Sequence, residues 1–224
     1  MLLLEETERN IDEALTEGIE NMWICFTAYI SISYVVSLRG SEGLLLDMNG
    51  LMKHWKRNDG TYFLIPLLGR IKGEEVERPH LIPCVNTTST QIRIKEVVRR
   101  LMKLKLKQGI ITGPAISDCQ GKSLTTSEFD DMMTEILENI FGHKPELFPP
   151  HILSKEHISE RYHCFRTLRR TSDTRAIEMN LKTTDIDIVN KWRQAGKRSS
   201  QPMKQYYAQI ELLMGPFKRY TKAM

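Results

Sequence analysis

The sequence has few of the features that mark secreted, metal-binding or membrane proteins. Its 224 residues contain only four cysteines, which are scattered and form no Cys-x-x-Cys pair. A disulfide framework or a zinc site is therefore not expected, and a reducing compartment is the default. The first residues lack the basic segment and the small-residue cleavage site of a signal peptide. We expect an intracellular protein that needs no metal or other cofactor.

Long hydrophobic runs are also missing. The longest apolar stretch, residues 22–36, has only 15 residues and carries Thr27, Ser31 and Ser33. A membrane-spanning helix needs about 20 apolar residues, so this stretch predicts a buried helix and no membrane. With 41% hydrophobic and 27% charged residues, the chain is typical of a globular protein with a core of its own. We predict a single domain over residues 1–224.

The charge is distributed unevenly along the chain, although the net charge is only +4. Residues 1–50 carry nine acidic and two basic side chains, whereas residues 161–224 carry fourteen basic and five acidic ones. Such an asymmetry indicates a polyanion on one side of the molecule, although a run of charge is often only a solvated helix face. The basic end also contains several of the candidate catalytic residues below, which favours double-stranded DNA as the partner.

Six spaced residues carry the functional signal. Arg39 ends a long apolar run, Lys72 lies in Gly-Arg-Ile-Lys-Gly between two strand-like segments, and a His-x-x-Arg motif lies further along. In chain order the candidate catalytic residues are Arg39, Lys72, His163, Arg166, Trp192 and Tyr207. Arginine forks match phosphate oxygens bidentately, and a tyrosine can hold a phosphate covalently. The set therefore suits attack on a phosphodiester without a metal.

The order and spacing of these residues resemble those of the tyrosine recombinase (phage integrase) family, whose catalytic core is shared in outline with type IB topoisomerases. The resemblance runs from about Glu13 to the C-terminus. It implies an α+β domain that is mainly α-helical, with a small antiparallel β-hairpin sheet. It also implies DNA recombination or integration, as in a mobile element, by a protein located with DNA in the cytoplasm, nucleoid or nucleus.

The resemblance implies a role for each matched residue. Arg39 and Arg166 would hold the nonbridging phosphate oxygens and stabilise the transition state. Lys72 would protonate the leaving 5′-oxygen as a general acid. His163 would donate to the phosphate or assist proton transfer, and Trp192 would supply an indole N–H. Tyr207 would then be the nucleophile.

Two questions about the site stay open in the sequence. Tyr206 is the alternative nucleophile, because it is one residue from Tyr207. Glu42 lies three residues after Arg39 on a predicted helix junction, where it would brace the guanidinium as a supporting residue. An isolated Arg–Glu pair at this spacing is more often a simple surface ion pair.

Helix and strand signals place these residues on elements. Apolar periodicity, caps and turn residues predict the following segments: helix 13–36, turn 37–43, short helix 43–48, strands 62–68 and 78–85 as a hairpin, and helices 89–107, 126–140, 159–179, 184–192 and 202–214. Gly109 is predicted as a C-terminal cap, and Lys72 is expected near the hairpin tip. Because they are three residues apart on a predicted helix, His163 and Arg166 are expected on one helical face.

The chain departs from the family in three respects. The segment Asn180–Thr184 lacks the glycine that usually follows the His-x-x-Arg helix, and the interval from Trp192 to Tyr207 is longer than usual. The separate N-terminal domain with which family members clamp DNA is also missing from this sequence. A longer segment before Tyr207 would affect whether this tyrosine acts in its own active site or in the active site of a neighbouring subunit.

Three functions fit the pattern. The first is a site-specific recombinase that self-associates on DNA as a synaptic tetramer. The second is a type IB topoisomerase, which relaxes DNA as a monomer, and the third is a catalytically silent DNA-binding remnant. The basic segment Phe217–Tyr220 favours the first, because the C-terminal tails of recombinases dock on a neighbour. Retention of all six positions argues against the third.

Overall fold

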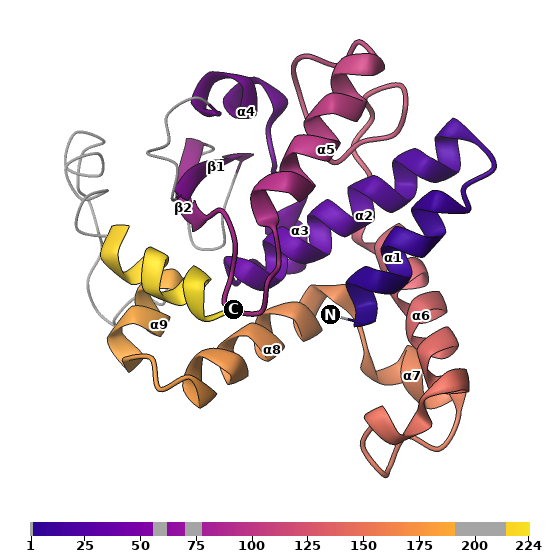
Figure 1. Cartoon of the computed structure of the whole chain (residues 1–224). Helices are drawn as coiled ribbons and strands as arrows, with labels where there is room; N and C mark the ends of the chain where they lie inside the picture. The colour runs from indigo at the N-terminus through magenta and orange to yellow at the C-terminus, as the bar shows by residue number, and fades with distance from the viewer. Residues whose placement is uncertain (1, 56–61, 70–77, 191–213) are drawn as a thin grey trace.

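The structure is a computed structural model that describes residues 2–55, 62–69, 78–190 and 214–224. Over these residues the chain is mainly helical and contains one two-stranded antiparallel sheet, as the sequence predicts (Figure 1). Its elements are α1 Leu2–Asp12, α2 Glu17–Val35, α3 Gly40–Gly43, α4 Met48–His54, β1 Tyr62–Gly69, β2 Arg78–Val85, α5 Ile94–Lys107, α6 Thr126–His143, the 3-10 helix η1 Pro145–Leu147, α7 Lys155–Arg161, α8 Cys164–Glu178 and α9 Thr183–Val189. A further helix covers residues 214–223.

The central element is α2, which packs against α1, α3, α5 and α8. Nearly all of its side chains from Asn21 to Val35 are buried, so the apolar stretch of the sequence is a core helix, as predicted. The Thr16 hydroxyl caps it by accepting a hydrogen bond from the Ile19 N–H at 3.3 Å. In the part of the chain that the structure describes, no helix has the length and apolar character needed to cross a membrane.

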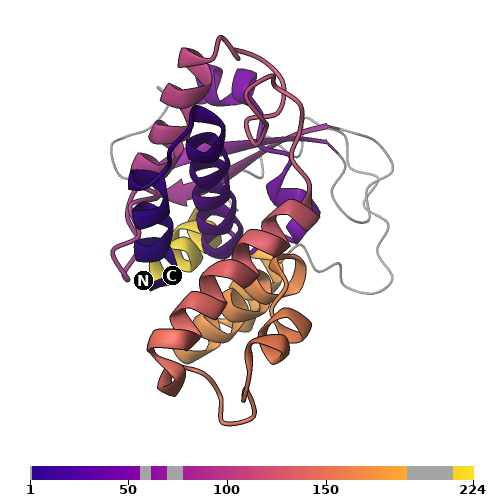
Figure 2. The same cartoon turned by 90° about the vertical axis from the view of Figure 1, so that its right-hand side faces the viewer.

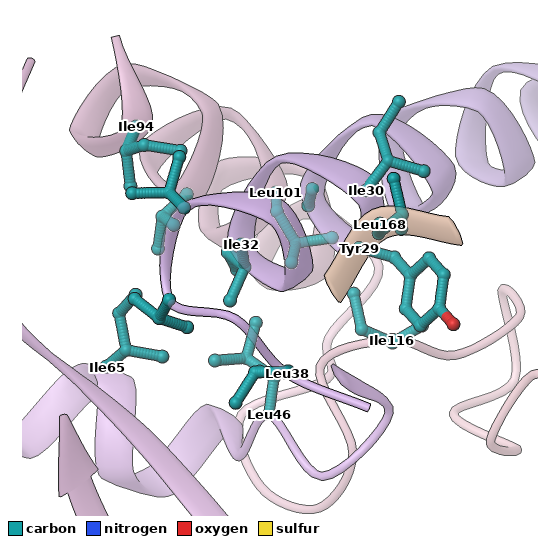
Figure 3. Packing of buried hydrophobic residues seen from close by; sticks show 14 of the residues in the cluster. Tyr29, Ile30, Ile32, Leu38, Leu46, Ile65, Ile94, Leu101, Ile116 and Leu168 are labelled. Atoms are coloured by element: carbon teal, nitrogen blue, oxygen red, sulfur yellow. The ribbon is translucent and has the colours of Figure 1, made fainter. Parts of the chain in front are cut away.

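The core surrounds α2. Figure 3 shows side chains of α2 meeting those of α5, β1 and α8, together with two leucines from the segment between α2 and β1. The labelled members are Tyr29, Ile30, Ile32, Leu38, Leu46, Ile65, Ile94, Leu101, Ile116 and Leu168. Burying each large aliphatic or aromatic side chain contributes about 1.5–3 kcal/mol. This packing fixes α3 and α8 relative to each other, and both bear candidate site residues.

The predicted hairpin is confirmed. Strands β1 and β2 pair antiparallel with Ile65 opposite Ile82, and Phe63, Ile65 and Leu67 of β1 are buried. Pro66 lies opposite Leu81. Residues 70–77, which contain Lys72, lie between the strands and outside the described residues.

The short helix predicted over residues 43–48 is wrong. Leu46 instead forms an antiparallel bridge with Leu67 of β1, and the Asp47 N–H donates to the Pro66 carbonyl at 3.1 Å. Helix α4 begins only at Met48, where the Asp47 carboxylate accepts from the Gly50 N–H at 2.6 Å. Pairing with a strand and an N-cap aspartate therefore override the local helical pattern.

The predicted helix over residues 159–179 is also wrong as one continuous element. It is divided at Tyr162 and His163 into α7 and α8. The Cys164 N–H donates to Asp130 Oδ1 of α6 at 2.6 Å, so a carboxylate from another helix caps the start of α8. Figure 2 shows α6 crossing in front of α8, which agrees with their packing contacts.

Other helix boundaries differ by smaller amounts. The helix predicted from Glu13 is preceded by the separate α1, and α5 begins at Ile94 rather than at residue 89. The N-cap of α6 is Thr125, not Thr126 or Ser127 as the sequence predicts, and its hydroxyl accepts from the Glu128 N–H. Gly109 follows α5 with a φ of +77°, which confirms the predicted glycine at the helix end.

The last helix, residues 214–223, packs on its own chain. Phe217 and Tyr220 are buried, and the Ser89 N–H donates to the Lys222 carbonyl at 2.8 Å. Phe217 and Tyr220 belong to the segment that was expected to dock on a neighbouring subunit, and both are buried against their own chain. In Figure 1 this yellow helix lies beside α9 and α8.

Candidate functional site

Arg39 stands at the junction between α2 and α3. It is the N-cap residue of α3, with extended backbone angles, and its side chain is 29% exposed. Glu42 is buried; its Oε2 accepts from the Arg39 backbone N–H at 3.0 Å, and its Oε1 lies 3.7 Å from the Arg39 Nη1. The carboxylate therefore braces the backbone and the guanidinium at once. This confirms that the two side chains predicted to pair do lie together.

A strained turn directs Arg39 toward α8. Ser37 has a φ of +54°, in the left-handed region, and the Leu38 N–H reaches back to the Ser33 carbonyl at 2.9 Å. This ends α2 with a left-handed cap that non-glycine residues adopt at some cost. Gly43 lets α3 lie directly on α2, since a Cβ there would come within 2.4 Å of the Ser33 hydroxyl.

His163 and Arg166 belong to the start of α8, but they do not share one helical turn as predicted. His163 is the N-cap residue with extended backbone angles, and its half-exposed ring has Nδ1 4.0 Å from Asp130 Oδ2. Its backbone N–H donates to the Thr167 hydroxyl at 3.1 Å. Arg166 is exposed, and its side chain makes no hydrogen bond or ion pair with any described residue.

Arg169, one turn after Arg166, is near enough to Arg39 for the two positive charges to interact. It is half-buried, and its Nη2 donates to the Asn190 carbonyl at 2.8 Å. Burial lowers the pKa of the Arg169 guanidinium, and the positive charge of Arg39 lowers it further, while Asp173 and Glu42 act in the opposite direction. Sequence reasoning missed this residue, because the His-x-x-Arg motif directed attention to Arg166.

A buried polar network lies beneath the two arginines. The Ser37 hydroxyl is 2.6 Å from Asn190 Oδ1 and 3.1 Å from Asp173 Oδ1. Asp173 Oδ1 also accepts from Asn190 Nδ2 and from the Tyr220 hydroxyl, each at 2.8 Å. Four elements are thereby joined: the end of α2, the middle of α8, the residue after α9 and the last helix. Serine, asparagine, aspartate and tyrosine satisfy one another, as buried polar groups must.

The remaining candidates lie outside the residues that the structure describes. These are Lys72, Trp192, Tyr206 and Tyr207. The strands on either side of Lys72 are described, as is Asn190, two residues before Trp192. Within the described ranges, no group of three or more His, Cys, Asp or Glu residues is placed to hold a metal ion.

The charge around the candidate site differs from that on the far side of α2. The basic helix α5 pairs with acidic residues of α1 and α2, Arg100 with Glu8 of α1 and Lys107 with Glu17 of α2. Part of the sequence's charge asymmetry is therefore neutralised within the molecule. On α8, by contrast, neither Arg166 nor Arg170 has a carboxylate partner among the described residues.

Comparison of the chain with family models, with curated protein sequences and with solved structures gave no match.

Proposed function

We propose that this chain is a site-specific DNA recombinase or integrase, which cleaves and rejoins DNA through a phosphotyrosine intermediate. The observation that carries the proposal is the placement of Arg39. Its guanidinium projects from a rigid helix junction, is braced by the buried Glu42 and lies beside a second arginine on α8. Such a pre-positioned donor suits a phosphodiester whose nonbridging oxygens gain charge in the transition state.

Each residue of the proposed site has its own role in the reaction. The Tyr207 phenol passes its proton to His163 and attacks phosphorus, so that a bond from tyrosine oxygen to phosphorus forms while the bond from phosphorus to the 5′-oxygen breaks. Lys72 supplies the proton that the departing 5′-oxygen takes up. Arg39 and an arginine of α8 hold the nonbridging oxygens, and the protonated His163 and Trp192 donate further hydrogen bonds. Rejoining reverses these steps, because the phosphotyrosine link retains the bond energy.

Support for this proposal also comes from the described parts of the fold. The predominantly helical domain with one antiparallel hairpin agrees with the architecture that the sequence resemblance implies. The hairpin strands are in place on both sides of the Lys72 segment, and the basic end of the chain includes α8. DNA as the substrate, and self-association on DNA, remain parts of the proposal.

The decisive experiment is to trap the covalent intermediate. The purified chain is incubated with a nicked suicide duplex in the presence of chelator, and the adduct is mapped by mass spectrometry. We expect a covalent adduct at Tyr207 that Tyr207→Phe abolishes while DNA binding stays nearly intact. Tyr206→Phe is the matched control, because it removes a neighbouring phenol and should leave the adduct.

Each other outcome has a definite meaning. Adduct that persists in Tyr207→Phe and vanishes in Tyr206→Phe would assign the nucleophile to Tyr206. DNA binding without any adduct in the wild-type chain would refute the strand transferase and favour the silent DNA-binding remnant. Adduct with relaxation of supercoiled DNA by a monomer, and no strand exchange, would favour the topoisomerase.

A further inference from the structure

Two arginines of α8 lie one helical turn apart in different surroundings. Arg166 is exposed and lacks a polar partner among the described residues, whereas Arg169 is half-buried and donates to the Asn190 carbonyl at 2.8 Å. That bond uses one of the five guanidinium N–H groups and holds the side chain in place. The remaining donors of Arg169 are thus pre-positioned, whereas the Arg166 side chain is exposed.

The same three residues, Ser37, Asp173 and Asn190, connect the backbone near Arg39 to the Arg169 side chain. Ser37 precedes Arg39 by two residues, and its hydroxyl lies within 3.1 Å of both Asn190 and Asp173. Asn190 in turn holds Arg169 through its carbonyl and bonds Asp173 through its amide. Asp173 is four residues after Arg169 on α8, on the same face of the helix. These contacts join the turn that precedes Arg39 and the Arg169 side chain in one polar network.

Among the described residues, no carboxylate is hydrogen-bonded to the guanidinium of Arg39 or of Arg169. Glu42 Oε2 accepts from the Arg39 backbone, and Glu42 Oε1 stands 3.7 Å from the guanidinium, beyond hydrogen-bond distance. Asp173 Oδ1 accepts from the Asn190 amide and the Tyr220 hydroxyl and lies 3.1 Å from the Ser37 hydroxyl. Two like charges are close enough for Arg39 to lower the pKa of Arg169. An anion bound between them would relieve that repulsion and use N–H donors that have no partner among the described residues.

We propose that Arg169, rather than Arg166, is the second guanidinium that holds a phosphate group together with Arg39. The inference rests on the proposed function for its ligand, a DNA phosphodiester, but the anion site itself stands on the geometry. Arg166 then has at most a peripheral role, in contact with the DNA backbone. Arg39 at the start of α3 and Arg169 in the second turn of α8 therefore bind the reacting phosphate together.

The first arm of the test measures covalent adduct formation by the full chain on the suicide duplex. Arg169→Gln should lower the rate at least about a hundredfold, the loss typical of removing a charged transition-state donor. Arg166→Gln and Arg170→Gln are matched controls on the same helix, and each should lower the rate less than about fivefold, since an exposed phosphate contact mainly affects affinity. Arg39→Gln should reproduce the Arg169→Gln defect.

The second arm uses inorganic phosphate and does not require cleavage. Phosphate at constant ionic strength should raise the unfolding temperature of the wild-type chain and of Arg166→Gln, but not that of Arg169→Gln. If the wild-type chain forms no adduct, the proposed function fails, and this arm alone decides whether the anion site exists. Loss of adduct in Arg169→Gln without any effect of free phosphate would identify the duplex phosphodiester as the ligand.

Folding of the variants is controlled by their unfolding midpoints without ligand. If Arg169→Gln does not fold, Arg169→Lys takes its place. Lysine keeps the charge but lacks the bidentate guanidinium, so the rate of adduct formation should fall at least about tenfold. The proposal is overturned if Arg166→Gln loses as much adduct as Arg169→Gln. It is also overturned if there is neither adduct nor a phosphate-dependent stabilisation that Arg169→Gln removes.

Discussion

The Tyr220 hydroxyl lies 2.8 Å from Oδ1 of Asp173, although 47 residues separate them in sequence. Tyr220 is fully buried, and its hydroxyl is also 2.8 Å from the Ser172 hydroxyl. Burial raises the pKa of the phenol, so that it stays protonated and able to donate. The last helix of the chain is therefore bonded to the carboxylate that lies beneath the two arginines.

Tyr220→Phe should destabilise the protein by about 1.5–3 kcal/mol, the usual range for a hydrogen bond to a charged group. The Phe ring keeps the packing, so the loss reflects the hydroxyl alone. Urea unfolding at pH 7 measures it. Tyr162→Phe is the control, because the half-buried Tyr162 hydroxyl has no hydrogen bond among the described residues, and it should change stability by less than about 0.5 kcal/mol. Equal effects in both variants would contradict the role given to Asp173.

The ion pair between Arg219 and Asp185 makes docking of the last helix dependent on pH. Arg219 Nε and Nη2 donate to the two carboxylate oxygens at 2.7 and 2.9 Å. These hydrogen bonds hold the pKa of Asp185 below its ordinary value. Because the folded pKa is below the unfolded one, the stabilisation is fully present above the unfolded pKa and is lost as the pH falls through the folded pKa.

Wild type should therefore be more stable than Asp185→Asn at pH 7 and at pH 5, both above the usual aspartate value of about 3.9. The difference should shrink toward zero as the pH falls below about 3.9, as Asp185 becomes protonated. Urea midpoints at a series of pH values measure this. Asp187→Asn, an exposed carboxylate on the same helix, should show no comparable dependence. A gap between wild type and Asp185→Asn that stays constant with pH would mean that packing, not charge, explains it.

The local sequence was sufficient to predict those elements whose formation depends on neighbouring residues alone. The hairpin followed from two β-rich segments on either side of a polar one, and the helix end at Gly109 followed from the residue itself. Boundaries set by distant partners could not be predicted in this way. Asp130 on α6 starts α8 at Cys164, and Leu67 on β1 holds Leu46 out of a helix. Both contacts form only after the chain has folded.

The candidate site shows the same division. Glu42 and Arg39 are three residues apart, so their pairing was predictable from helical spacing. Which arginine of α8 faces Arg39 depends on the rotation of α8 about its axis, and that is set by Leu168 and Ala176, which pack into the core. The motif His-x-x-Arg contains no information on that rotation. The spacing of four between Arg169 and Asp173 was the one available signal.

The four cysteines should differ sharply in reactivity. Cys25, Cys84 and Cys164 are buried, and burial raises the pKa of each thiol, which removes the reactive thiolate. Cys119 is only partly buried. At pH 8 a thiol reagent should therefore modify Cys119 in the native chain and all four cysteines after denaturation. Mass spectrometry of the native reaction checks this, and Cys119→Ser should lack the fast phase. Rapid modification of two or more sites would contradict the burial of this core.

A buried lysine joins three parts of the core. Lys105 of α5 is fully buried, with its Nζ 2.6 Å from Asn21 Oδ1 of α2 and 2.6 Å from the Ser117 carbonyl. The Asp118 carbonyl lies at 3.3 Å. Because the partners are neutral oxygens, the ammonium group serves as a donor that satisfies buried acceptors from a helix and a loop.

Lys105→Met keeps most of the side-chain volume and removes the donor, so Asn21 Oδ1 loses its ammonium partner, while the Ser117 carbonyl still accepts from the Asn21 amide at 3.0 Å. We expect a loss of about 1–3 kcal/mol in the free energy of unfolding, measured with urea. Lys103→Met on the exposed side of the same helix is the matched control and should cost less than about 0.5 kcal/mol. Adding Asn21→Leu to Lys105→Met should cost less than the sum of the single changes, because both partners of one bond are then gone. Wild-type stability in Lys105→Met would show that water or a backbone shift satisfies these acceptors, and that the lysine does not hold the loop to the core.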